Sequence, residues 1–217
     1  MENKTKLICC KTMMEEVEKI RPENQPVEYM EYALHRTPDR LREELQKRID
    51  AEEEADTLVF VYGLCSRGLD GLKAGDKTLV IPRVHDCISL LLGSREKYNQ
   101  EFGSDPGTYY LSKGWIDQKA DPLQEYQEYA EKYGEDNALW ITREAYKNYK
   151  RIVFIDTALP EVEEYVEYAR KVADFLKVDF VRIKGEPDFF KKIIEWDWEG
   201  SCVIVPPGGV SNYQDFM

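Results

Sequence analysis

Short apolar runs alternate along the chain with longer amphipathic stretches. β-Branched and aromatic runs predict strands at 6–10, 57–62, 78–84, 151–156, 180–183 and 202–205, with a weaker one at 27–34. Apolar residues recurring every three or four positions predict helices at 39–55, 88–92, 121–133, 143–149, 161–176 and 187–196. Residues 94–119 contain glycine and tyrosine without clear periodicity. We expect this segment to form a functional loop or lid.

The order of these elements predicts the fold class. Strands that alternate with helices require crossover connections and form a parallel sheet. We therefore expect an α/β fold of three layers, Rossmann-like, with a mainly parallel sheet and helices on both faces. The 217 residues contain no low-complexity linker, which favours a single α/β domain over 1–217. Two packed lobes, about 1–120 and 121–217, are the alternative.

Charge and hydropathy exclude several classes of partner. The net charge is −12, which repels nucleic acid and anionic membrane surfaces. The apolar run Leu7–Cys10 is too short for the core of a signal peptide, and the sequence has no membrane-spanning run of about 18 apolar residues. We expect a cytoplasmic protein that binds neither nucleic acid nor membranes.

Cysteine and histidine residues follow the predicted strands at their carboxyl ends. Cys10 ends the first strand, His35 follows the second, Cys65 the third, and His85 and Cys87 the fourth. Ligands of open α/β sheets bind at this edge, and thiolate with imidazole is the usual donor set for zinc. These five residues are therefore candidate ligands of zinc or another transition metal. The alternative is that each cysteine only fills the core, which we expect of the two remaining cysteines, Cys9 and Cys202.

A thiol nucleophile is a rival interpretation of the same region. Cys65 lies in the turn-like segment 62–68, where the nearby Arg67 would lower its pKa and His85 would act as base. A simple turn, in which the glycines supply unusual backbone angles, is the plainer reading.

Aromatic residues in the segment 106–115 suggest a small-molecule pocket. Tyr109, Tyr110, Lys113 and Trp115, together with Arg67, are candidate ligand-binding residues beside the cysteine cluster. The alternative is a lid whose rings only pack onto the core.

Several motifs resemble an uncharacterised protein family. They are Tyr62-Gly63-Leu64-Cys65, the segments 82–88, 92–95 and 106–111, and Gly114-Trp115. The chain is similar to the domain of unknown function DUF1638, whose members are often encoded beside corrinoid-dependent methyltransferases. The resemblance implies an accessory role in one-carbon metabolism, and its motifs coincide with the five candidate metal ligands.

Three functions follow as hypotheses. The first is a zinc-binding protein, accessory to corrinoid-dependent methyl transfer. The second is a thiol enzyme with Cys65 as nucleophile and His85 as base. The third is a protein without chemistry of its own that binds a small molecule or a corrinoid, as partner of a corrinoid protein or methyltransferase.

Overall fold

The computed structural model describes residues 4–216 and divides the chain into two compact units. The second unit is Glu96–Glu186, and the first is made of the chain before and after it. No helix within the described residues is long and apolar enough to cross a membrane.

The first unit is built on a five-stranded sheet. Its strands are β1 (Thr5–Cys10), β2 (Val27–Met30), β3 (Thr57–Val61), β4 (Thr78–Pro82) and β8 (Cys202–Val205). Their spatial order is β2-β1-β3-β4-β8, with β8 antiparallel to β4 and all other pairs parallel. Strand β3 is buried along its whole length, as expected for a central strand covered on both faces.

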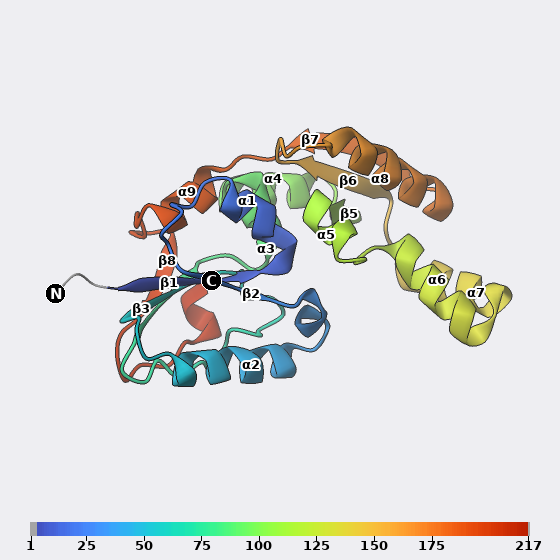
Figure 1. Ribbon diagram of the computed structural model, residues 1–217. Helices are drawn as coiled ribbons and strands as arrows, with labels where there is room; N and C mark the ends of the chain where they lie inside the picture. The colour runs from blue at the N-terminus through green and yellow to red at the C-terminus, as the bar shows by residue number, and fades with distance from the viewer. Residues whose placement is uncertain (1–3, 217) are drawn as a thin grey trace. The chain divides into compact units, whose positions relative to one another are not determined.

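Helices cover both faces of this sheet. Helices α1 (Met14–Glu18), α3 (Cys87–Leu92) and α9 (Asp188–Ile194) lie on one face, and α2 (Pro38–Ala51) lies on the other (Figure 1). Helix α2 begins with proline at its first position and buries Leu41, Leu45 and Ile49, which recur every four residues. Short 3-10 helices occupy Lys11–Met13 (η1), Tyr32–Arg36 (η2) and Tyr213–Phe216 (η3).

The second unit has a parallel sheet of its own. Strands β5 (Thr108–Leu111), β6 (Arg151–Asp156) and β7 (Asp179–Lys184) pair in that order. Its helices are α4 (Arg95–Ser104), α5 (Lys113–Asp117), α6 (Pro122–Tyr133), α7 (Glu135–Tyr146) and α8 (Val162–Leu176). The buried face of α8 packs on β6 and forms the core of this unit.

The α/β fold class predicted from the sequence is confirmed, and the structure differs from the expected elements in the following details. The strands form two sheets instead of one, and β8 runs antiparallel. The expected loop or lid at 94–119 is wrong, because the segment contains α4, β5 and α5. The helix expected at 143–149 is α7, which begins at Glu135, and the second strand ends at Met30 rather than Leu34.

Candidate functional site

The carboxyl edge of the first sheet contains a topological switch point. The connection from β1 to β2 carries α1 on one face, and the connection from β2 to β3 carries α2 on the other face (Figure 1). A crevice forms beyond the carboxyl ends of β1 and β3 in sheets of this order, and ligands bind there. Cys10 is the last residue of β1, and Cys65 follows β3 by four residues.

Two thiols and a phenol gather at this point. Cys9 is level with Val61 in the parallel register, so the next residue of each strand brings Cys10 level with Tyr62. The Cys10 thiol accepts a hydrogen bond from the Thr12 hydroxyl at 3.2 Å. The Tyr62 hydroxyl is buried and has no nitrogen or oxygen partner within residues 4–216; its hydrogen-bonding neighbour is the Cys10 thiol. A buried hydroxyl without a full partner is energetically costly and is found at sites that take a ligand or water.

Burial disfavours the thiolate form of both cysteines. Cys10 is 6% exposed and Cys65 is 3% exposed. Burial raises the pKa of Cys65 well above its ordinary value, and the nearby Cys10 and Asp86 raise it further. Burial also raises the pKa of Cys10, and hydrogen bonds from Thr12 and Tyr62 oppose that shift. Cys10 ends β1 and Cys65 follows β3, the strand paired with β1, so both thiols belong to the same edge of the sheet.

The turn that carries Cys65 has an unusual backbone. Cys65, Ser66 and Arg67 have φ of 47°, 54° and 71°, so three consecutive residues with side chains are left-handed. The left-handed conformation costs roughly 1–2 kcal/mol per residue for L-amino acids, and such strain concentrates at functional sites. The Gly68 amide donates to the Cys65 carbonyl at 3.0 Å and closes the turn.

The turn after β4 lies directly against this segment. The amides of Leu64 and Cys65 donate to the carbonyls of Val84 and His85, each at 2.9 Å. Gly63 is required here, because a Cβ at that position would come within 2.5 Å of the Asp86 backbone. The Asp86 carboxylate caps α3 by accepting from the Ile88 amide.

Asp86 also connects His35 to the site. Burial lowers the pKa of His35, and the charge of Asp86 opposes that change. The His35 ring stacks on Tyr32 with centroids 5.8 Å apart. The charge of Asp86 thus raises the pKa of both His35 and Cys65.

The structure brings together only part of the predicted ligand set. Cys10 and Cys65 lie at the carboxyl ends of two paired strands, whereas His85 contacts Cys65 through its backbone and its side chain is exposed. Cys87 is buried at the start of α3. Across residues 4–216, no three His, Cys, Asp or Glu side chains are arranged to hold a metal ion. Cys9 and Cys202 are buried; Cys202 opens β8 opposite Pro82 of β4.

Arg67 has structural partners of its own. Its guanidinium donates to Asp70 at 2.5 Å and lies 4.1 Å from the centre of the Tyr213 ring. The pKa of Cys65 shifts opposite to the lowering that Arg67 was expected to produce. Arg67, Ser66 and Asp70 line a cavity of about 670 Å³ together with Pro38, Asp39, Arg42 and Gly71 from both sides of the turn.

The four aromatic-segment residues lie in the second unit. Tyr109 contacts the rings of Tyr146 and Tyr149 edge-on, with centroids 5.5 and 5.3 Å apart. Lys113 pairs with Asp117 at 2.9 Å and lies 4.6 Å from the centre of the Tyr165 ring. The Trp115 side chain is partly buried against the core of that unit, and Tyr110, on the same strand as Tyr109, is also partly buried. That these residues bind a ligand beside the cysteines stays a prediction.

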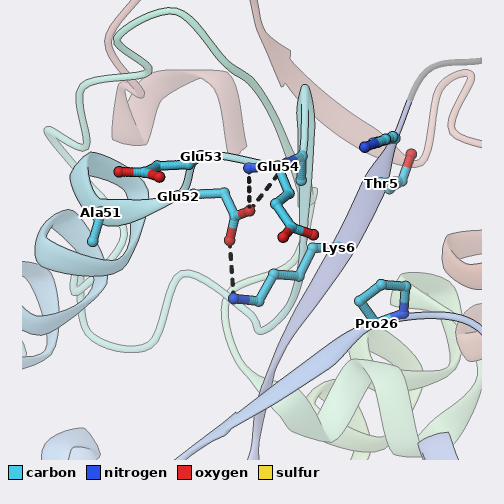
Figure 2. Close-up of a pocket in the computed structure, with 9 residues that line it drawn as sticks. Thr5, Lys6, Pro26, Ala51, Glu52, Glu53 and Glu54 are labelled. Carbon is cyan, nitrogen blue, oxygen red and sulfur yellow. Dashed lines mark hydrogen bonds and ion pairs between the residues drawn. The ribbon is translucent and has the colours of Figure 1, made fainter.

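The amino edge of the first sheet has a different character. A cavity of about 550 Å³ opens there between the start of β1 and the end of α2. Lys6 pairs there with Glu52 at 2.9 Å, and Glu52 also accepts from the amides of Glu54 and Ala55 (Figure 2). Lys6 also pairs with Glu28 at 2.9 Å. Arg48 of α2 completes the network by binding Glu28. The network joins β1, β2 and α2, which is a structural role.

Comparison with known protein families identifies the chain. A family model described as a protein of unknown function, DUF1638, matches residues 29–194. The chain belongs to the DUF1638 family. The matched part includes His35, Cys65, His85 and Cys87, and begins after Cys10. No curated protein and no solved structure matches the chain.

The sequence did not predict a role for three residues at the carboxyl edge of the first sheet. Tyr62 reads as the last residue of an ordinary strand, although its place directly before Gly63 was a signal. Asp86 lies between His85 and Cys87, and only the structure reveals it as the group near both His35 and Cys65. Arg42 lies on the polar side of α2, where sequence gives no sign of its contact with the Cys65 turn.

Proposed function

We propose that this protein binds a metal ion, zinc by preference, at the carboxyl edge of its first sheet, with Cys10 and Cys65 as thiolate ligands. The observation that supports it is the pair of buried thiols at the carboxyl ends of the paired strands β1 and β3, at the switch point, with a Tyr62 hydroxyl that has no nitrogen or oxygen partner in the described residues. Thiolates are soft ligands that select zinc and related metals over magnesium and calcium.

The raised pKa values of the thiols fit a metal-free state. A metal ion displaces the protons of the thiols that it binds, and it supplies the positive charge that stabilises two neighbouring thiolates. Because Cys10 and Cys65 are only two ligands, we propose that the segment His85–Cys87 moves to supply a third and that His35 supports the site. The hydrogen bond between the Cys65 amide and the His85 carbonyl keeps that segment adjacent.

Elemental analysis of anaerobically purified protein tests the proposal. We expect about one zinc ion per chain in the parent and at least a tenfold loss of metal in Cys10→Ser and Cys65→Ser, because a serine hydroxyl is a hard, protonated ligand. Cys202→Ser is the matched control, since that thiol is also buried but lies on β8. Absence of metal from the parent, or stoichiometric metal in both ligand variants, would refute the proposal.

Thiol chemistry at Cys65 is the second candidate function. The three left-handed residues at 65–67 favour it, because strained turns of this kind present nucleophiles in enzymes. It ranks second since burial of the thiol opposes formation of the thiolate that such chemistry needs. In this function His85, which is exposed, would approach Cys65 as base.

The physiological setting is proposed from the family resemblance alone. We propose that the protein acts in the cytoplasm beside corrinoid-dependent methyl transfer, with a corrinoid protein or methyltransferase as partner. Tyr109, Tyr110, Lys113, Trp115 and Arg67 remain the proposed contacts of a small-molecule or corrinoid ligand. A coloured complex after incubation with a corrinoid supports that ligand; colourless protein after gel filtration opposes it.

A further inference from the structure

The Cys65 turn depends on contacts from outside itself. Three consecutive left-handed residues are disfavoured in any L-peptide, and three backbone bonds span this turn: the amides of Gly68, Leu69 and Asp70 donate to the carbonyls of Cys65, Leu64 and Arg67. Such a conformation persists where the surrounding structure holds it. The elements packed against the turn therefore decide where the Cys65 thiol lies.

Helix α2 supplies two of these contacts through adjacent residues. The Arg42 guanidinium donates to the Arg67 carbonyl at 3.1 Å, and its other amino group donates to Asp39 at 3.1 Å. Leu41 packs so closely on Gly68 that a Cβ there would come within 2.7 Å of the Leu41 side chain. The carbonyl of Arg67, the last left-handed residue, thus accepts from Arg42 as well as from the Asp70 amide at 3.2 Å, next to the position where Leu41 packs on the end of the turn.

The other side of the turn is held independently. Arg67 donates from its own guanidinium to Asp70, and Asp70 accepts from the Tyr213 amide at 2.9 Å. The incoming backbone at Leu64 and Cys65 is bonded to the β4 turn. Arg42 is the contact that reaches the turn from α2 by hydrogen bonding, and it lines the cavity outside the turn.

We propose that Arg42 is a positioning residue for Cys65. By holding the Arg67 carbonyl it keeps residues 65–67 left-handed, and the left-handed turn keeps the Cys65 thiol buried beside Cys10. Loss of this contact lets the turn relax and exposes the thiol. The inference rests on the proposed function only in that it concerns the same thiol.

The test is the rate of alkylation of Cys65 in reduced, metal-free protein, followed by peptide mass spectrometry with iodoacetamide as probe. We expect Arg42→Met to speed alkylation of Cys65 about tenfold or more, because local opening exposes the thiol. Arg42→Lys should give a smaller increase, since an ammonium still donates to the carbonyl. Added guanidinium ion, well below denaturing concentration, should slow the reaction again in Arg42→Met.

Two controls separate positioning from general loosening of the fold. Arg40→Met removes an exposed arginine from the same helix and should leave the rate at Cys65 unchanged. Cys202, buried on β8, should react equally slowly in all variants. An unchanged rate at Cys65 in Arg42→Met, or equal acceleration of Cys65 and Cys202, overturns the inference.

Metal content distinguishes this inference from the proposed function. If the parent holds no metal but Arg42→Met exposes Cys65, the metal proposal fails and the positioning role stands. If the parent holds zinc and Arg42→Met leaves alkylation of the metal-free protein unchanged, the positioning role fails and the metal proposal stands.

Discussion

The two edges of the first sheet differ in how fully their polar side chains are paired. At the amino edge, Lys6 is bonded to Glu52 and Glu28, and Glu28 to Arg48. At the carboxyl edge, the Tyr62 hydroxyl lacks a nitrogen or oxygen partner and the Cys10 and Cys65 thiols are buried and protonated. Both edges have a cavity of several hundred cubic ångströms nearby.

The difference separates a structural edge from a functional one. Paired charges stabilise the junction of β1, β2 and α2 and leave little for a ligand to satisfy. Unpaired polar groups and strained backbone reduce stability, and natural proteins keep them where a ligand or reaction uses them. Cavity size alone does not make this distinction, whereas hydrogen bonding does.

The largest expected effect is a stability loss at alkaline pH that comes from the carboxyl edge. The folded pKa of Cys10 and Cys65 lies above the ordinary value near 9, so stabilisation that is present below pH 9 is lost as pH rises. In metal-free reduced protein the free energy of unfolding should fall by up to about 1.4 kcal/mol per pH unit per thiol between about pH 9 and 10.5. Urea unfolding at several pH values measures it.

Replacement of both thiols supplies the control for this slope. Cys10→Ser combined with Cys65→Ser should flatten the alkaline dependence, because Ser does not ionise there. The remaining slope should come from the buried Cys9 and Cys202, whose pKa values burial also raises, that of Cys202 to about 11. An equally steep dependence in the double variant would contradict the assignment.

The next effect concerns the amino edge. Lys6→Met leaves Glu52 and Glu28 without their shared cation and should lower the free energy of unfolding by about 2 kcal/mol. It should leave metal content unchanged, since the change lies at the opposite edge. Lys47→Met is the matched control: its pair with Glu44 is exposed, so the free energy of unfolding should change far less than in Lys6→Met. Loss of metal in Lys6→Met would break the separation of the two edges.

The dependence of stability on acid pH gives a second test of the ion pairs at the amino edge. Burial raises the pKa of Glu52, but hydrogen bonds from Lys6 and from the amides of Ala55 and Glu54 outweigh it and lower the pKa overall. The stabilisation from Glu52 is therefore present above its ordinary value of 4.5 and is lost as pH falls. Urea unfolding at acid pH should show a weaker dependence in Lys6→Met than in the parent, and an identical dependence would argue against the pairing.

The smallest expected effect is Tyr62→Phe. Removal of a buried hydroxyl without a nitrogen or oxygen partner should leave the free energy of unfolding unchanged or raise it by up to about 1 kcal/mol. Lys6→Met and Tyr62→Phe each remove one polar group, one from the amino edge and one from the carboxyl edge. The two changes in free energy of unfolding can therefore be compared directly. A loss of more than about 1 kcal/mol would show that the hydroxyl is satisfied in the native protein.

The sequence predicted the strand-end cysteines because a local rule covers them. Short runs of β-branched and aromatic residues predict strands. The carboxyl ends of parallel strands lie at one edge of the sheet. Cys10 and Cys65 follow from that rule. Arg42 does not, since its contact with Arg67 joins residues 25 apart in sequence on different elements.

The errors in the predicted fold also come from contacts between residues that are far apart in the sequence. Strand β5 is only four residues long and depends on pairing with β6, which lies some forty residues further along the chain. Its sequence, TYYL, has no alternation that marks one buried face. Whether β8 runs parallel or antiparallel likewise depends on where the chain returns, which composition does not encode.

The insertion of Glu96–Glu186 has a consequence for biosynthesis. Strand β8, which covers the outer side of β4, is translated only after the whole inserted unit. Until then the apolar strand Thr78–Pro82 presents an unpaired edge on the ribosome, a known route to aggregation. Ser211, which bonds to Leu69 and Leu72, arrives later still. The nascent first unit is therefore the state in which the edge of β4 is open to wrong pairing.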